Sequence, residues 1–200
     1  GIWSVGELWP GDNYHLALSY FQSGLSDEGY EILKGTFMNT GLCGTVPGNL
    51  GFHQGGRDFG DCIHPFVRSV VSGLFGYQPD YPSGQVILAP SFPTSWKEAN
   101  IHVPDFSLSF QEAKDVLNYH VVLLNNAALK IQIPVSCCAV KSVSINGKPV
   151  NYRILPAAGR SIVVAQSEKA NDFSIRIEYD RPLPYYKPLH FTFSQNSTQN

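Results

Sequence analysis

Residues 61–88 read DCIHPFVRSVVSGLFGYQPDYPSGQVIL, and within this stretch the hydrophobic period changes from that of a helix to that of a strand. Before Gly76 the apolar residues recur at the three- and four-residue spacing of one helix face, and they are Ile63, Phe66, Val67, Val70, Val71, Leu74 and Phe75. After Gly76 apolar and polar residues alternate, as they do in strands with one buried face. The stretch therefore predicts a helical part up to about residue 80 and a β part after it.

Two further helices are predicted ahead of this stretch. Asp12 can cap a helix that ends at Gly24, and the apolar residues of this helix lie nearly all the way round, which indicates a buried helix. Ser26 can cap the next helix, which ends near Gly41. Three helices of which one is apolar on all sides cannot cover one another. We therefore expect that they end a larger helical array or that they dock tightly onto the β part.

The residues after position 80 carry many short alternating segments separated by turn residues. Asn146-Gly147 predicts a two-residue hairpin, because both residues tolerate the positive φ angles of its turn. This pattern is typical of an antiparallel β-sandwich, with strands expected over residues 85–88, 100–103, 106–111, 116–124, 128–134, 142–145, 150–155, 161–164 and 173–179. The predicted fold is α+β and multidomain, with an incomplete helical domain at 1–80, a sandwich at 81–182 and a tail or strap at 183–200.

The composition limits the classes of function. Charged residues make up 15% of the 200 residues, against about 25% in an average protein, and the formal net charge is -2. Because the chain has no cluster of Lys and Arg, no nucleic-acid partner is expected. No apolar run approaches the roughly 18 residues of a membrane helix, so no membrane partner is expected either.

The four cysteines give no sign of a metal site. Cys43, Cys62, Cys137 and Cys138 form no Cys-x-x-Cys pair, so neither a structural zinc site nor another metal or cofactor is expected. All four can be buried free thiols, or Cys43 and Cys62 can form a disulfide, and the sequence leaves both alternatives open.

The order of the helices brings two segments together. Because an antiparallel helix separates them, the first and third helices run parallel, and the segments 3–12 and 43–61 that lead into them meet on one face. Both segments carry groups that a sugar site needs, since Trp faces stack on pyranose rings and two carboxyl groups can cleave a glycosidic bond. We expect a catalytic pair with a surrounding set of substrate-binding residues: Glu7 and Asp58 as the pair, and Trp3, Trp9, His53, Gln54, Arg57 and Asp61 as the set.

Simpler roles stay open for several of these residues. Asp61, like Asp12, can be a helix cap, and Trp3 and Trp9 can be core or interface anchors. Arg57 and Asp58 can merely pair with each other. Four further histidines have no partner spacing and are expected to be structural: His64, His102, His120 and His190.

Five short stretches resemble (α/α)6-toroid glycoside hydrolases of the rhamnosidase-like and glucosidase-like kind, namely WPGDNY (9–14), SDEGY (26–30), FGD (59–61), GLFG (73–76) and GQVILAPSFP (84–93). The first two are similar to the late helical hairpins of such toroids and the next two to the last inner helix. The fifth is similar to the strand that links the toroid to a C-terminal β-sandwich. The order of these parts, over about residues 1–180, carries the resemblance more than any one stretch does.

The resemblance implies the C-terminal portion of a polysaccharide-degrading enzyme that is secreted or periplasmic and needs no cofactor. It implies a carbohydrate ligand, and either the remainder of a larger polypeptide or a partner chain that covers the helices. Such toroids carry a catalytic Glu in the loop before the last inner helix, whereas residues 44–51 read GTVPGNLG and Asp58 is the nearest carboxylate. We therefore expect the 200-residue chain alone to be inactive.

Two other functions compete with this one. The chain can be a non-catalytic carbohydrate-binding or accessory module in which Trp3, Trp9 or Trp96 stacks on sugar. It can also be a structural domain that packs on a partner chain. An enzyme requires two carboxyl groups in one cleft, about 5 Å or roughly 6.5–9.5 Å apart, whereas the other two functions do not.

Overall fold

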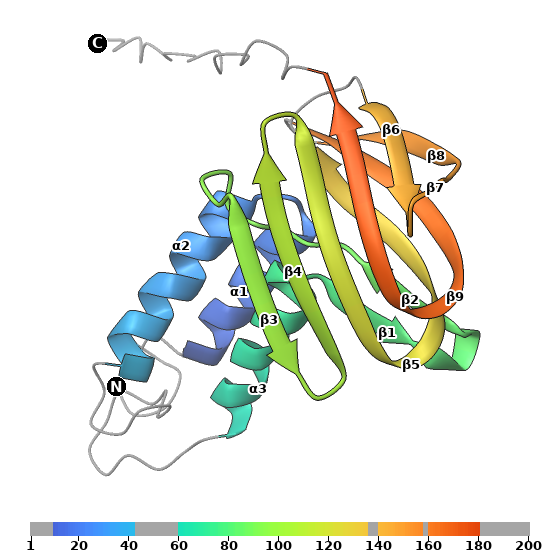
Figure 1. Cartoon of the computed structure of the whole chain (residues 1–200). Coiled ribbons are helices and arrows are strands. Elements are labelled where there is room, and N and C mark those ends of the chain that lie inside the picture. Colours follow the sequence, from blue (N-terminus) through green and yellow to red (C-terminus); the bar gives the residue numbers. More distant parts are fainter. Residues whose placement is uncertain (1–9, 43–59, 136–139, 158–159, 181–200) are drawn as a thin grey trace, which may run out of the picture.

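The computed structural model of the chain describes residues 10–42, 60–135, 140–157 and 160–180, which are the coloured parts of Figure 1. These residues form three short helices followed by a large, mostly antiparallel sheet, so the predicted mixed α+β class is confirmed. Figure 1 shows the helices gathered at one side of the sheet. No helix in the described part of the chain has the length and apolarity needed to cross a membrane.

The helical part consists of α-helices that are extended by π-helical turns, in the order α1 (Pro10–Gln22), α2 (Ser26–Thr36), a π-helical turn (Phe37–Leu42), α3 (Gly60–Arg68) and a second π-helical turn (Ser69–Leu74). Between α1 and α2 the chain reverses at Gly24, whose φ of 79° is the left-handed conformation that glycine adopts without strain. The amide of Leu25 donates to the carbonyl of Tyr20 at 2.9 Å and so closes the end of α1.

Two glycines allow the helices to approach closely around Phe21. A Cβ atom on Gly29 of α2 would lie 2.9 Å from Cδ1 of Phe21, and one on Gly73 would lie 2.8 Å from Cδ2 of the same ring. The Phe21 side chain therefore fills the space between α2 and the second π-helical turn. Only residues without a side chain fit on either side of it.

The sheet contains nine strands in one hydrogen-bonded network, which are β1 (Tyr77–Asp80), β2 (Gln85–Leu88), β3 (Glu98–Val103), β4 (Phe106–Ala113), β5 (Val116–Val135), β6 (Val140–Ile145), β7 (Lys148–Pro149), β8 (Tyr152–Ala157) and β9 (Arg160–Tyr179). Only the β2–β5 pair is parallel among the strand pairs of the described residues. The turn between β6 and β7 has positive φ angles at Asn146 (52°) and Gly147 (73°), which confirms the predicted hairpin.

The two 20-residue strands β5 and β9 hold the sheet together by pairing with each other along almost their whole length. The first half of β5 also pairs with β4 and its second half with β2, while β9 pairs first with β8 and then with β6. The register shifts between Val122 and Ala127, where the strand changes neighbours. The prediction of four separate strands in these two regions is therefore wrong, because polar residues there accompany a shift in register and not a reversal of the chain.

The helices are attached to the sheet by one continuous apolar cluster, which includes Phe21 and Leu33 from the helices and Phe106 from the sheet. Backbone hydrogen bonds reinforce the attachment. The Ala89 amide donates to the carbonyl of Gly76, and the Ser91 amide donates to the carbonyl of Leu74, both at 2.9 Å. The expected tight docking of the helices onto the β part is thus observed.

Several local expectations for the helices are wrong. The helix α1 is not buried on all sides, since Leu16 is 47% exposed. Because α1 begins at Pro10, Asp12 lies within its first turn and not at its N-cap. The helix α2 begins at Ser26 itself, whose hydroxyl contacts the sheet in place of its own helix. The division into domains at 1–80, 81–182 and 183–200 stays a prediction.

Candidate binding pocket

Most of the predicted site lies outside the described residues. This applies to both members of the catalytic pair and to five of the substrate-binding residues: Glu7, Asp58, Trp3, Trp9, His53, Gln54 and Arg57. Asp61 belongs to the first turn of α3, but its side chain is not among those described. The meeting of the two segments at one cleft therefore stays a prediction.

Within the described residues, a pocket opens between the β2–β3 connection and the inward face of the sheet. Its volume is about 150 Å³, which is room for a handful of water molecules. Aromatic and proline side chains form most of its wall, and the groups that matter for its chemistry are Phe92, Trp96, Phe110, Glu112, Tyr119 and Tyr179. They come from the β2–β3 connection (residues 89–97) and from strands β4, β5 and β9.

Strand alternation places the polar groups of this pocket. Phe106, Leu108 and Phe110 are buried on the inward face of β4, and Glu112 takes the next inward position. Tyr179 ends a similar series of inward residues on β9. Two polar side chains therefore lie at one end of the core, beside the turn between β4 and β5.

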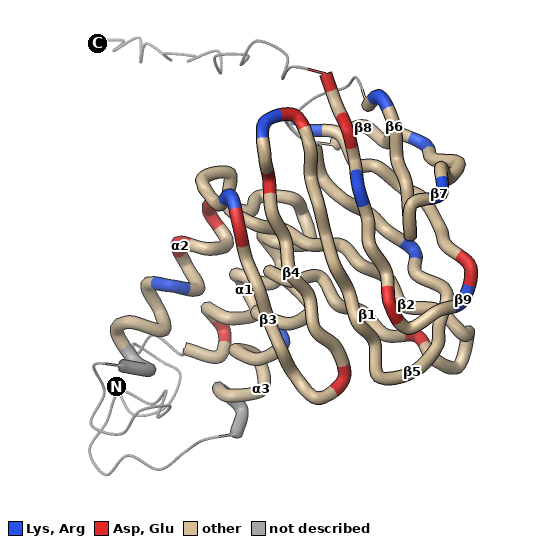
Figure 2. The backbone as a smooth tube through the Cα atoms, viewed as in Figure 1, with Lys and Arg blue, Asp and Glu red and all other residues tan. Residues whose placement is uncertain are grey.

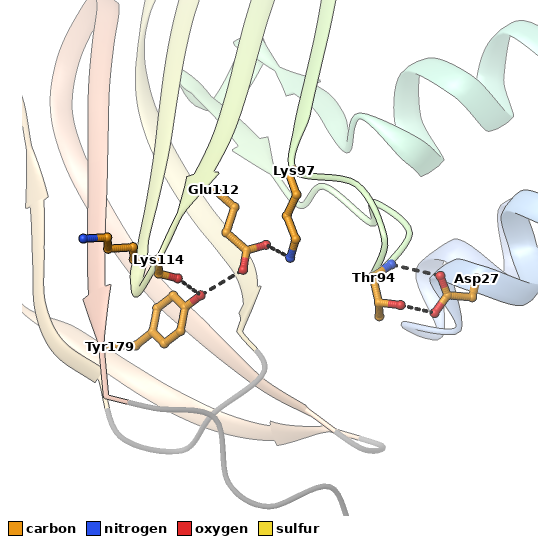
Figure 3. Close-up of polar contacts among 6 residues, drawn as sticks. All are labelled: Asp27, Thr94, Lys97, Glu112, Lys114 and Tyr179. Carbon is orange, nitrogen blue, oxygen red and sulfur yellow. Dashed lines mark hydrogen bonds and ion pairs between the residues drawn. The ribbon is translucent and has the colours of Figure 1, made fainter.

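The carboxylate of Glu112 is held by two partners, as Figure 3 shows. The hydroxyl of Tyr179 lies 3.1 Å from Oε1, and the ammonium of Lys97 lies 3.1 Å from Oε2. The same hydroxyl lies 3.3 Å from the carbonyl oxygen of Lys114, so its single proton is shared. Burial raises the pKa of neighbouring Tyr119 well above its ordinary value of 10.0, and the nearby Glu112 raises it further, so Tyr119 stays neutral.

A second polar cluster joins α2 to the sheet. The two carboxylate oxygens of Asp27 accept from the amide and the hydroxyl of Thr94, each at 2.9 Å, as Figure 3 also shows. The Ser26 hydroxyl lies 2.7 Å from the Ser91 hydroxyl and accepts from the guanidinium of Arg160 at 2.9 Å. Burial lowers the pKa of Arg160, and Asp27 opposes this effect. The guanidinium stays charged all the same.

Trp96 takes part in the same junction. Its ring meets the Tyr30 ring of α2 edge-on, with the centroids 5.0 Å apart, and lies 6.0 Å from the Phe92 ring in a stacked orientation. The side chain is half-buried. It packs α2 against the β2–β3 connection, and this contact uses part of the surface that a sugar ring would need.

The polar groups of the pocket hold the surrounding segments together and do not form a hydrolytic centre. Glu112 is the only carboxylate among the described residues that line it, and both oxygens of Glu112 already accept hydrogen bonds. Acid/base cleavage of a glycosidic bond needs two carboxyl groups with room for substrate between them. The described part of the chain also has no group of three or more His, Cys, Asp and Glu residues that could hold a metal ion.

Sequence reasoning missed the polar groups of this pocket, although Glu112 leaves a signal. A carboxylate at the fourth inward position of an alternating strand, after three apolar residues, has to be either paired or placed at the end of the core. Arg160 leaves no such signal. Its contact with Ser26 joins residues 134 positions apart in the chain, so only the folded structure shows it.

Known proteins resemble this chain only weakly. No model of a protein family matches it, and no curated protein sequence matches it. The chain is similar in structure to the α-L-rhamnosidase from Dictyoglumus thermophilum, with a TM-score of 0.42 and 12% identity over 64% of this chain and 15% of that one. It is also similar to a GH127 β-L-arabinofuranosidase from Geobacillus stearothermophilus T6, with a TM-score of 0.30 and 13% identity over 61% and 19%. Both of these proteins are glycoside hydrolases, and this chain spans less than a fifth of either one.

Proposed function

We propose that this chain is the C-terminal portion of a glycoside hydrolase that acts on poly- or oligosaccharides by carboxylate acid/base catalysis. In this proposal Glu7 and Asp58 face the sugar, and the described residues support the cleft without taking part in the chemistry. The sequence resemblance to the last hairpins and the sandwich of (α/α)6 toroids supports the proposal. The rest of such a toroid would cover the apolar side chains that the helices expose.

The observation that carries the proposal is the apolar surface of the helices. Leu16 of α1, Met38 after α2 and Val67 of α3 are 47%, 45% and 48% exposed. A single exposed apolar side chain is common on any protein. Here each of the three helical segments supplies one, although each also buries residues against its neighbours. This supports a place in a larger helical array, whose further helices would cover these side chains.

A second candidate function is a non-catalytic carbohydrate-binding or accessory structural module. It is favoured by the small number of acids in four pockets formed by the described residues, because each of these pockets has at most one Asp or Glu among its lining residues. A binding module needs no pair of acids. Both candidates share a carbohydrate ligand. For both we propose a secreted or periplasmic location, where a protein encounters polysaccharides.

The test is turnover of a panel of glycans by the natural full-length protein, measured as release of reducing sugar. Glu7→Gln and Asp58→Asn are each expected to lower kcat by about a hundredfold or more. Glu112→Gln, which changes a carboxylate of the described pocket, is the control and should keep the parent rate. The 200-residue chain alone should be inactive.

The outcomes separate the two candidates. If the parent is active and both variants at positions 7 and 58 keep its full rate, the proposed catalytic pair is wrong. If the parent cleaves no glycan of the panel but binds one of them, the accessory module replaces the hydrolase. If it neither cleaves nor binds any of them, the carbohydrate function itself is contradicted.

A further inference from the structure

The outer face of the sheet, on the side away from the apolar core, is hollowed. The hollow has a volume of about 640 Å³ and extends over strands β3, β4, β5, β9 and β6. Its outward-facing lining consists of polar side chains, and its central residues are Asn100, Ser109, Gln111, Asn118, His120 and Ser174. We name this surface the outer sheet hollow.

Strand register arranges the polar side chains of the outer sheet hollow in two rows. The first row crosses the sheet through directly paired residues, in the order Asn100, Ser109, His120 and Ser174. The second row lies two residues further along each strand, in the order Glu98, Gln111, Asn118, Arg176 and Ser144. With strands about 4.8 Å apart, a row over five strands is about 19 Å long, which is enough for several sugar rings in line.

The rows offer donors and acceptors without net charge. Asn and Gln amides and Ser hydroxyls can each donate and accept, as the hydroxyls of a sugar also can. Of the side chains of Asn100, Gln111 and Asn118, none makes a hydrogen bond to another described residue. They are therefore free to bind a ligand.

The hollow has no excess of positive charge. Asp172 lies beside it, with Oδ1 3.0 Å from Nε2 of the lining residue His120. Glu98 is the one acid and Arg176 the one invariably charged base among its described lining residues. Arg176 is held by Glu178, whose Oε1 lies 2.8 Å from the guanidinium and whose pKa is lowered by this hydrogen bond. Figure 2 shows acidic and basic residues close together along β9, with no broad area of one sign on this face. A neutral ligand therefore fits this surface better than an acidic polymer does.

The hollow exists because its side chains are short. A solvent-exposed strand face is often covered by the long stems of Lys and Arg. Here Ser and Asn occupy five of the nine row positions. The inward neighbours Phe110, Tyr119 and Ile175 are buried on the other face, so they fix the strands in place beneath the rows.

From these observations we propose that the outer sheet hollow is a binding site for a neutral glycan chain that lies across the strands. The ligand class rests on the proposed carbohydrate function, but the site involves neither Glu7 nor Asp58. Because the described part of the hollow offers no exposed Phe, Tyr or Trp ring for stacking, binding depends on hydrogen bonds and should be weak and tolerant of the sugar type. Its role would be to keep a polysaccharide close to the protein.

The experiment uses two-dimensional NMR of the chain, whose Asn and Gln side-chain amides report binding directly. The probes are the neutral polysaccharides dextran, arabinan, xyloglucan and galactomannan, with polygalacturonate and double-stranded DNA as acidic comparisons. We expect saturable shifts of the side-chain amides of Asn100, Gln111 and Asn118 with at least one neutral glycan. Neither acidic polymer should produce them.

Two matched variants complete the test. Gln111→Leu keeps a side chain of similar size and removes its hydrogen bonds, so it should weaken binding by roughly three- to tenfold. Gln166→Leu changes an exposed Gln of β9 outside the hollow and should leave the affinity unchanged. Far-ultraviolet circular dichroism confirms that both variants are folded.

The inference is overturned if no neutral glycan shifts these amides, if the acidic polymers shift them equally, or if the two Leu variants bind alike. These outcomes differ from failure of the proposed function. A protein that cleaves glycans but shows no shift contradicts only the outer sheet hollow. A protein that shows the shifts but cleaves nothing keeps the hollow and supports the accessory module.

Discussion

Gly76 decides how closely the helices can lie against the sheet, and Gly76→Ala tests this point. The residue follows the second π-helical turn and its C-cap Phe75, and it has a φ of 69°. A Cβ atom there would lie 2.0 Å from the backbone carbon of Ala89, 2.1 Å from its oxygen and 2.3 Å from the nitrogen of Pro90. Backbone atoms cannot rotate away as a side chain can, so the two segments would have to separate.

The expected cost has three sources. The left-handed backbone costs an alanine about 1–2 kcal/mol, and overpacking against a rigid neighbour adds about 1–3 kcal/mol. Separation of the segments also weakens the hydrogen bonds of the Ala89 and Ser91 amides, which are 2.9 Å long and contribute about 1 kcal/mol each. If the two weakened hydrogen bonds lose about 1 kcal/mol between them, the sum is about 3–6 kcal/mol, which is a large part of the 5–15 kcal/mol that stabilises a typical domain.

Two glycines provide controls with the same backbone conformation. Gly147 has a φ of 73° and no atom within 4 Å of an added Cβ, so Gly147→Ala should cost only about 1–2 kcal/mol. At Gly84, with a φ of 69°, the nearest atom is the mobile Nζ of Lys169 at 3.0 Å, and the cost should be similar.

Urea unfolding followed by circular dichroism gives the three free energies. The reasoning is refuted if Gly76→Ala lies within about 0.5 kcal/mol of Gly147→Ala, because the close approach to Ala89 would then have no energetic effect. Failure of Gly76→Ala alone to fold agrees with the expected cost.

Three further predictions concern other parts of the molecule. Burial raises the pKa of Tyr119 above its ordinary 10.0. Above pH 10 the unfolded state therefore binds fewer protons than the folded state. The free energy of unfolding then falls as the pH rises, by at most about 1.4 kcal/mol per pH unit. Tyr119→Phe should make this decline shallower in urea unfolding between about pH 9 and pH 11, and an unchanged slope would contradict the burial argument. Asp27→Ala removes both hydrogen bonds to Thr94 and should lower the free energy of unfolding by about 1–2 kcal/mol, whereas no measurable loss would mean that this joint is not formed in solution. In the isolated chain, the double change Leu16→Ser and Val67→Ser should alter the free energy of unfolding by only about 1 kcal/mol and reduce self-association measured by light scattering; a cost above about 3 kcal/mol would show that the chain itself covers these side chains.

Local sequence signals predict most elements of this fold because these signals act over a few residues. The stripe from Ile63 to Phe75 yields a helix, and the strand expected over 85–88 has the observed bounds. The same reasoning fails for β5 and β9, where polar residues in mid-strand resemble turns. Whether a strand continues through such residues depends on its partners, and those partners lie far away in the chain.

The candidate site was less predictable, for a different physical reason. Asp12 and Ser26 are residue types that favour the N-cap of a helix, yet the Ser26 hydroxyl contacts Arg160 of β9 and Ser91 of the β2–β3 connection. A helix cap and a hydrogen bond to a distant segment both require a side chain with a hydrogen-bonding group. Only the packing of α2 against the sheet decides between the two roles.

The pocket that contains Glu112 and Tyr179 and the outer sheet hollow depend on the register of the same strands. On β5, Tyr119 points into the core and lines the pocket of Glu112 and Tyr179, while its neighbours Asn118 and His120 belong to the outer rows. Because successive side chains alternate between faces, a shift of one residue would exchange the two sets. The β5–β9 pairing therefore fixes both surfaces at once, and a change that slips this pairing should disturb the attachment of the helices and glycan binding together. A change confined to the outer rows should disturb glycan binding alone, which is why Gln111→Leu can separate the function of this face from the stability of the fold.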